Sequence, residues 1–250
     1  MTHPPRILAI AGSDSSGGAG IQADIKTITM LGGYAMTAVT VLTAQNTLGV
    51  SAIEPVAPTL VAEQIEACRS DIGVDAVKVG MLGSAEVAET VASALDGLQA
   101  PIVFDPVMVA TSGAILADPP TIAAFEHLMS VATLTTPNVA ELAALGGPEA
   151  MAARGVAYLA KGGDAEGDTV EDALIVPGRP PRRFAAPRIV TRHTHGTGCT
   201  LSSAIATFLG QGLALDEAIA RARGFVRAAL LAAPGFGGGS GPLGHGQAQF

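Results

Sequence analysis

The feature that most constrains the fold is the alternation of short apolar runs with longer runs of helical periodicity. Residues 6–11, 75–79 and 101–104 have the composition of buried strands. The segments after them repeat apolar residues every three or four positions, as an amphipathic helix does. Strands that alternate with helices form a mostly parallel sheet covered on both faces. We therefore expect an α/β protein, built as a three-layer α/β/α sandwich around a mostly parallel central sheet.

The chain shows no internal repeat and no interdomain linker, so residues 1–250 are predicted to form a single domain. Residues 34–44 and 50–56 are rich in β-branched residues. We expect these two strands to form a small β flap, at about residues 34–56, off the helix-covered sheet. The tail at 234–250 is rich in glycine and is predicted to be mobile.

Charge and cysteine content exclude several classes of protein. The formal net charge is −8, and the only lysines are Lys26, Lys78 and Lys161, so no basic stripe exists to bind nucleic acid. No apolar stretch reaches the length of about 18 residues that a transmembrane helix needs. The two cysteines lie far apart in sequence and fit neither a disulfide framework nor a zinc site. We expect a cytoplasmic protein with no membrane partner.

A glycine-rich loop at residues 194–199 passes directly into a helix. Leu201, Ile205 and Phe208 share one face of that helix. Glycines let the loop curl so that its N–H groups converge, and the first N–H groups of a helix lack internal partners. Such a site stabilises a phosphate or another developing negative charge. The same position favours a thiolate, which makes Cys199 a candidate base.

A second glycine-rich loop, at residues 12–20, links the first strand to a helix. Its glycine spacing matches neither a dinucleotide fingerprint nor a Walker loop. Loops at the carboxyl ends of strands form the ligand rim of open α/β sheets. Asp24 lies on the first turn of the following helix, within reach of the loop. Gln45 ends a predicted strand, where its amide is available to a ligand.

Polar side chains follow two further strands. Asp105 comes directly after the strand at 101–104, and Asn138 and Glu141 lie three residues apart at a helix start. Two carboxylates and an amide on one rim suit Mg²⁺ held largely through water. The spacing of Asn138 and Glu141 equally fits a capping box, which needs no metal and which the spacing alone favours.

Taken together, these segments resemble the hydroxymethylpyrimidine/phosphomethylpyrimidine kinases of thiamine biosynthesis, in the ribokinase-like superfamily. The resemblance covers nearly all of residues 6–245. The loops at 11–24 and 194–200 are its most specific parts. Shorter matching segments lie at 42–47, 78–82, 105–108, 136–138 and 161–163.

The resemblance implies that ATP phosphorylates the hydroxymethyl group of an aminopyrimidine and then converts the monophosphate to the diphosphate. It implies a pyrimidine pocket in which the amide of Gln45 hydrogen-bonds the ring, since an amide is both a donor and an acceptor. The residues that it places around the pyrimidine are Gly12, Asp24, Gln45, Met81 and Val107.

The resemblance also implies how the phosphates are bound. Cys199 stands where most sugar kinases of the superfamily carry an aspartate base, after the anion-binding residues Gly196, Thr197 and Gly198. Asp105 and Glu141 match the metal region, which favours a metal role for them over the capping box. The residues that match the nucleotide-phosphate region are Asn138, Lys161, Gly162 and Gly163. The implied cofactors are ATP and Mg²⁺, and the flap implies a homodimer.

Two features depart from the family pattern. The segment at 146–158 is short, as if one outer helix were truncated. Thr111 and Asp164 stand where some relatives carry Lys and His. The loss of a cation near the phosphates is predicted to slow the second phosphorylation, and a Thr111→Lys variant with no gain in that step would refute this.

Three other functions fit parts of the pattern. A pyridoxal-type kinase shares the fold and the Cys or Asp position, although Gln45 and residues 11–24 argue against it. A pyrimidine-binding module without catalysis would keep the pocket but not need Asp105, Glu141 and the loop at 196–199. A thiol enzyme would use Cys199 covalently, but no acyl-transfer pattern accompanies His193 and His195.

Overall fold

The computed structural model is a three-layer α/β/α sandwich around one nine-stranded sheet, and it describes residues 3–109, 113, 115–163 and 165–249. The strand order is β3-β2-β1-β4-β5-β6-β7-β8-β9. Six neighbouring strands are parallel to one another, namely β2, β1, β4, β5, β6 and β7. The strands β3, β8 and β9 join the sheet through antiparallel pairs. The predicted fold class is confirmed.

The strands are short and lie close to the positions that the sequence predicts. Their bounds are β1 Arg6–Asp14, β2 Tyr34–Asn46, β3 Gly49–Pro55, β4 Ala76–Val79, β5 Ile102–Phe104, β6 Leu134–Thr135, β7 Tyr158–Ala160, β8 Thr169–Ile175 and β9 Arg182–Pro187.

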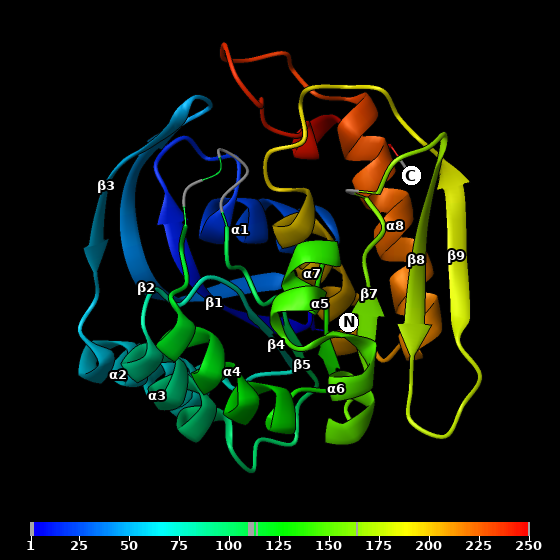
Figure 1. Ribbon diagram of the computed structural model, residues 1–250. Coiled ribbons are helices and arrows are strands. Elements are labelled where there is room, and N and C mark those ends of the chain that lie inside the picture. The colour runs from blue at the N-terminus through cyan, green and yellow to red at the C-terminus, as the bar shows by residue number, and fades with distance from the viewer. Residues whose placement is uncertain (1–2, 110–112, 114, 164, 250) are drawn as a thin grey trace.

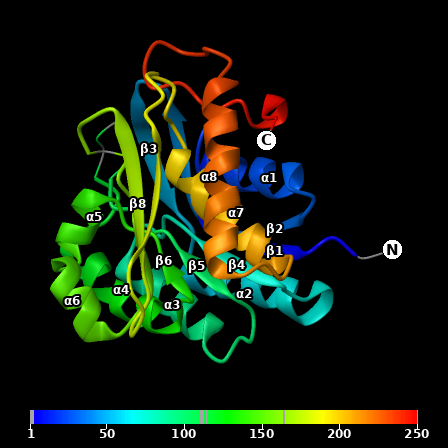
Figure 2. The same cartoon turned by 90° about the vertical axis from the view of Figure 1, so that its right-hand side faces the viewer.

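Helices cover both faces of the sheet (Figures 1 and 2). On one face lie α2 Pro58–Ala67, α3 Ala85–Leu95, α4 Pro119–Val131 and the short helices α5 Val139–Ala144 and α6 Gly147–Arg154. On the other lie α1 Gly20–Met30, α7 Thr197–Gly210 and α8 Leu215–Leu231. A π-helical turn follows α2 at Cys68–Ile72, and a 3₁₀ turn lies at His245–Gln247. In the described part of the chain, no helix is long and apolar enough to cross a membrane.

Alternation along β1 divides the core in two. Leu8 and Ile10 point into the cluster under α2, α3 and α4, whereas Ile7 and Ala9 point into the cluster under α1, α7 and α8. Successive residues of a strand face opposite sides of the sheet. All four side chains are nevertheless buried, because helices cover both faces. The central strands are therefore apolar on both faces, as a parallel sheet requires.

Two helices begin where local signals in the sequence indicate. The Ser84 side chain accepts a hydrogen bond from the Val87 N–H, and Asp118 does the same for Thr121. Pro119 follows directly, at a position where its missing N–H costs nothing.

The flap is less separate than predicted. The hairpin of β2 and β3 exists, but residues 34–43 of β2 pair with β1 and belong to the central sheet. Met36, Ala38 and Val41 are buried there, so this half of β2 is core strand. Only the distal part, where β2 pairs with β3 alone, extends beyond the sandwich.

The C-terminal tail packs against the rest of the chain around residues 241–245. Leu243 and His245 are buried, and the Gly244 N–H donates to the Ala229 carbonyl oxygen of α8. The Gly241 carbonyl oxygen accepts a hydrogen bond from the His195 N–H, which ties the tail to the loop before α7. These contacts lie far apart in sequence, so the glycine content alone could not indicate them.

Candidate active site

A cavity of about 720 Å³ opens at the carboxyl ends of the parallel strands. It is lined by loops that the sequence places far apart, including both glycine-rich loops and the ends of β2, β5 and β7. The predicted site residues that line it are Gly12, Gln45, Met81, Asp105, Val107, Asn138, Glu141, Lys161, Gly163, Gly196, Thr197, Gly198 and Cys199. Asp24 and Gly162 are not among its lining residues.

The loop before α7 can adopt its shape only with glycine. Gly196 has φ +89°, in the left-handed region, and a Cβ atom there would overlap the Gly18 carbonyl oxygen. The two glycine-rich loops therefore pack against each other. Thr197 and Gly198, the first residues of α7, line the cavity, and the helix dipole adds positive potential there. The Thr197 N–H donates to the Thr194 carbonyl oxygen at 3.2 Å, so it is already paired within the loop. Anion binding by this loop stays a prediction, which its position at the positive end of α7 supports.

The thiol of Cys199 lines the cavity but is not predisposed to ionise. Its removal from water raises its pKa to about 11, and the neighbouring Lys78 ammonium only partly opposes that rise. We expected the helix N-terminus to favour the thiolate, and that expectation was wrong for this structure. Burial outweighs the attraction of the Lys78 ammonium, so the neutral thiol form of Cys199 is favoured at pH 7.

Asp24 lies behind the cavity. One of its oxygens, Oδ2, is 2.8 Å from the Lys78 Nζ, and Oδ1 accepts a hydrogen bond of 2.6 Å from the Ser203 hydroxyl. Asp24, Lys78 and Ser203 are all fully buried. The side chain therefore does not line the cavity in which the pyrimidine is predicted to bind. The carboxylate instead ties α1 to β4 and α7 beneath the anion-binding loop.

Lys161 links the two predicted metal ligands. Its Nζ lies 2.8 Å from Asp105 Oδ1 and 3.6 Å from Glu141 Oε2. Burial alone would lower the pKa of Lys161, but the two carboxylates raise it above its usual range, so the ammonium stays charged. The Asp105 Oδ1 atom also accepts a hydrogen bond from the buried Thr136 hydroxyl.

The capping box that the spacing favours is present. The Asn138 side chain accepts a hydrogen bond from the Glu141 N–H at 2.8 Å, and the Glu141 carboxylate accepts one from the Asn138 N–H at 2.7 Å. Glu141 therefore caps α5 and at the same time faces Lys161. Among the described residues, no group of three or more His, Cys, Asp or Glu side chains is placed to hold a metal ion.

Gly162 has a packing role. Its N–H donates to Asp172 Oδ1 at 2.8 Å, and a Cβ atom would overlap the Glu171 carbonyl oxygen. It lets the segment after β7 pass close to β8 and so positions Lys161 and Gly163 on either side. Thr111 and Asp164, the predicted departures from the family pattern, lie outside the described residues.

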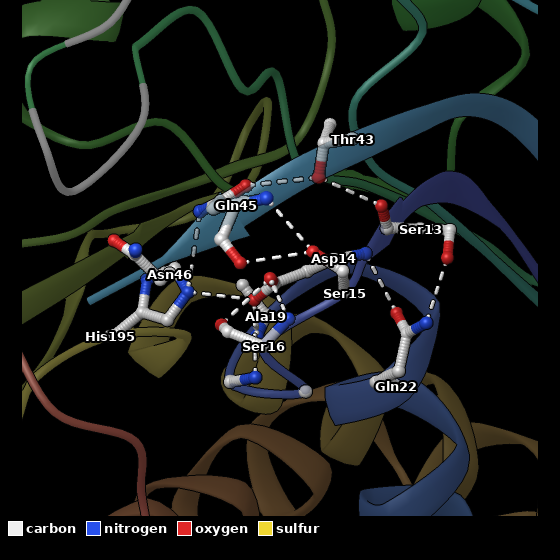
Figure 3. A network of polar contacts seen from close by, with 12 residues as sticks. Ser13, Asp14, Ser15, Ser16, Ala19, Gln22, Thr43, Gln45, Asn46 and His195 are labelled. Carbon is white, nitrogen blue, oxygen red and sulfur yellow. Dashed lines mark hydrogen bonds and ion pairs between the residues drawn. The ribbon is translucent and has the colours of Figure 1, made fainter. Parts of the chain in front are cut away.

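Asp14 and His195 form a pair that the sequence did not predict as part of the site (Figure 3). The His195 Nε2 lies 2.8 Å from Asp14 Oδ2, and both side chains are buried. Asp14 also accepts hydrogen bonds from the N–H groups of Ser16, Gly18 and Ala19. Although burial alone would raise it, the pKa of Asp14 is lowered to about 2 by hydrogen bonds from His195, Ser16 and the Ala19 N–H.

Comparison with known proteins identifies the family to which the chain is similar. The sequence model of the phosphomethylpyrimidine kinase family matches residues 14–244. A hydroxymethylpyrimidine/phosphomethylpyrimidine kinase of Streptomyces coelicolor is 44% identical, over 98% of this chain and 96% of its own. A thiamine biosynthesis bifunctional protein of Geobacter sulfurreducens is 46% identical over 96% of this chain, which spans only 52% of that protein.

Among solved structures, an ADP complex of pyridoxal kinase from Bacillus subtilis superimposes with a TM-score of 0.89 and 33% identity. The match covers 98% of each chain.

Proposed function

The chain belongs to the phosphomethylpyrimidine kinase family, and we propose that it uses ATP to phosphorylate 4-amino-5-hydroxymethyl-2-methylpyrimidine, first to the monophosphate and then to the diphosphate, in thiamine biosynthesis. One observation carries this proposal. A single cavity joins an apolar and amide-lined end to an end with a helix N-terminus, a lysine and two carboxylates. These are the two halves that phosphoryl transfer to a small heteroaromatic alcohol needs.

The pyrimidine occupies the end formed by Gly12, Gln45, Met81 and Val107. A Cβ atom at Gly12 would lie 3.3 Å from the Met81 sulfur, so the lack of a side chain leaves room for a flat ring. The Gln45 amide is the polar group of this end and hydrogen-bonds the ring. Gly12 lies on β1 and Gln45 on β2, which places both at the same edge of the sheet.

The phosphates occupy the other end. The Gly198 N–H and the positive end of the α7 dipole neutralise the charge that develops on the transferred group, and the nearby Lys161 ammonium adds to this effect. Cys199, a neutral thiol, orients the substrate hydroxyl by hydrogen bonding. This assignment suits phosphoryl transfer, in which positioning and charge stabilisation supply most of the catalysis.

The donor set fits Mg²⁺ held indirectly. Asp105 and Glu141 already share Lys161, which leaves too few protein oxygens for a closed cage. Mg²⁺ commonly keeps several waters and binds through one or two carboxylates together with substrate phosphates. Asp105 and Glu141 would hold the ion in that way. The chemistry supplied by a bound Mg²⁺ would be charge neutralisation at the phosphates.

Turnover of ATP with hydroxymethylpyrimidine, with mono- and diphosphate products resolved, tests the proposal. We expect both products, with the diphosphate appearing after the monophosphate. Monophosphate alone would refute the second step and would point to the loop containing Thr111. Binding of the pyrimidine without ATP consumption would refute the kinase and favour a binding module.

Pyridoxal phosphorylation is a second candidate, because the ADP-bound pyridoxal kinase of Bacillus subtilis has nearly the same fold. The ratio of kcat/KM for hydroxymethylpyrimidine to that for pyridoxal separates the two. We expect the pyrimidine to be preferred, and a ratio below one would reverse the assignment.

We also propose that the protein is a cytoplasmic homodimer that associates through the flap. Its two cysteines, Cys68 and Cys199, are free thiols. The strand β3 forms one edge of the sheet and exposes Ile53, and Leu48 is exposed in the adjoining turn. Light scattering after size-exclusion chromatography gives the mass directly, and a monomer at micromolar concentration would refute the dimer.

A further inference from the structure

The side chain of His195 lies between two polar groups of the cavity wall (Figure 3). Its Nε2 atom is 2.8 Å from Asp14 Oδ2 and 3.4 Å from the Gln45 side-chain nitrogen. Asp14 belongs to the first glycine-rich loop, Gln45 to β2, and His195 to the loop before α7. One ring nitrogen therefore joins the pyrimidine end of the cavity to the anion-binding loop.

The protons of this contact can be assigned. The Asp14 carboxylate, with its pKa lowered to about 2, is only an acceptor at neutral pH. A ring nitrogen at 2.8 Å from it must therefore carry a proton and donate it. Once protonated, His195 Nε2 has no lone pair for the N–H groups of an amide. The contact between Gln45 Nε2 and His195 Nε2 thus sets one donor against another.

A half turn of the Gln45 amide removes this conflict. The amide oxygen would then face the His195 N–H, and the amide nitrogen would take the position that now lies 3.3 Å from the Thr43 hydroxyl oxygen. That hydroxyl already donates its proton to the Ser13 carbonyl oxygen at 2.9 Å, so it has lone pairs left to accept one. Every donor in the chain of contacts then has an acceptor.

We infer that His195 is a positioning residue, which fixes the Gln45 amide with its oxygen toward His195 and its nitrogen toward Thr43. This inference rests on the proposed pyrimidine kinase function and extends it to substrate specificity. The fixed amide keeps one N–H and one oxygen lone pair for the ligand, in a set order. That pair complements an amino group next to a ring nitrogen, which an aminopyrimidine has and a simple pyridine alcohol lacks.

Packing keeps the imidazole in this position. The side chain of His195 is buried against Gly18, where a Cβ atom would overlap the ring. The His195 backbone N–H is held by the Gly241 carbonyl oxygen of the tail at 3.1 Å. The imidazole is thus fixed from the loop side and from the tail side, as a group that orients another must be.

The test compares His195→Gln, which can keep an N–H near the Nε2 position, with His195→Phe, which cannot. The matched control is His193→Phe, two residues away and outside the cavity lining. Each variant is assayed with hydroxymethylpyrimidine and with its analogue that lacks the amino group. We expect His195→Phe to raise KM for the pyrimidine about tenfold or more and to lose most of the discrimination against the analogue. KM for ATP should change by less than about twofold.

His195→Gln should restore discrimination to within about threefold of wild type, and His193→Phe should retain it. Thr43→Val, which removes the acceptor on the other side of the amide, should weaken discrimination in the same direction. It serves as the second variant if His195→Phe does not fold. Unchanged discrimination in His195→Phe, or in Thr43→Val where His195→Phe does not fold, would overturn the inference. The inference would also be overturned if a folded His195→Gln variant discriminated against the analogue as poorly as His195→Phe does.

The side-chain ¹⁵N–¹H resonances of Gln45, assigned with a Gln45→Glu variant, give a readout that needs no turnover. We expect them to shift in His195→Phe and to stay in place in His193→Phe. If the wild-type protein neither binds nor phosphorylates the pyrimidine, the proposed function fails, and these resonances still test the positioning role. Gln45 resonances that do not move in His195→Phe would overturn that role.

Discussion

The Lys78 ammonium lies 2.8 Å from Asp24 Oδ2, and neither side chain has any exposed surface. Burial by itself would lower the pKa of Lys78, but the attraction of Asp24 and of the neighbouring groups raises it above its usual range. The lysine is therefore charged in the core. Ser203 of α7 donates a hydrogen bond to the same carboxylate, which connects the ion pair to the helix that follows the loop at 194–199.

Removal of one partner should be more damaging than removal of both. Lys78→Met leaves a buried carboxylate without its cation, and we expect it to lower the free energy of unfolding by about 3–5 kcal/mol. The double variant Lys78→Met with Asp24→Leu should recover most of that loss, since it buries no charge. Urea unfolding monitored by circular dichroism measures both. A double variant less stable than Lys78→Met would contradict this account.

The thiol of Cys199 should react slowly at neutral pH. With its pKa raised to about 11, the thiolate fraction in the free protein is small and grows with pH. We expect the rate of alkylation by iodoacetamide to rise about tenfold per pH unit from about pH 7 to about pH 9. A Cys68→Ser background isolates the reaction, because Cys68 is the other free thiol. A rate that levels off below about pH 8 would show that the helix N-terminus prevails over burial.

The periodicity of apolar residues was sufficient to predict the layers of this fold, because the pattern of each strand and helix depends on local sequence alone. The strand at 6–11 and the helices capped by Ser84 and Asp118 carry signals within four residues. The loop at 196–199 could be identified for the same reason, since a glycine turn that enters a helix determines its own geometry. The β flap was harder to delimit, because nothing local distinguishes the half of β2 that pairs with β1.

The positions that sequence reasoning misplaced are those decided by long-range contacts. Asp24 looks like a ligand of the loop until Lys78, 54 residues away, is brought against it. The pKa of Cys199 depends on burial, which no motif reports. Asp14 and His195 are 181 residues apart, and the close packing of the two glycine-rich loops at Gly18 and Gly196 brings them together. The one available signal was that each lies within a glycine-rich loop.

Lys161 should be needed for catalysis more than for folding. It is the ammonium between Asp105 and Glu141 at the phosphate end of the cavity. We expect Lys161→Met to lower kcat/KM for the pyrimidine about 10²- to 10³-fold, as the loss of one charge-stabilising donor does in other enzymes. Steady-state kinetics with a thermal unfolding control measure the effect.

The matched control for this prediction is Lys26→Met. The Lys26 ammonium donates to the Gly17 carbonyl oxygen in an exposed contact and does not line the cavity. We expect its loss to change kcat/KM by less than about threefold. If both lysine variants lost activity equally, the role of Lys161 would be general electrostatics and not direct contact with phosphate.

The tail should make stability depend on pH through His245. Its Nε2 lies 2.8 Å from the Thr200 hydroxyl of α7, and burial lowers the pKa of this histidine from 6.5 to about 4. Between these two values the unfolded chain binds a proton that the folded chain does not. Its contribution to stability is therefore fully present above pH 6.5 and is lost as the pH falls toward 4. A shift of this size corresponds to a loss of about 3 kcal/mol.

Urea unfolding at a series of pH values tests this contribution when the wild type is compared with His245→Gln. The glutamine can keep a hydrogen bond to Thr200 but does not titrate. We expect the stability of the wild type to fall more steeply than that of the variant between about pH 6.5 and about pH 4, and the two curves to run parallel above about pH 7. Parallel curves throughout the acid range would mean that His245 titrates alike in both states, and that the tail opens before the rest of the fold.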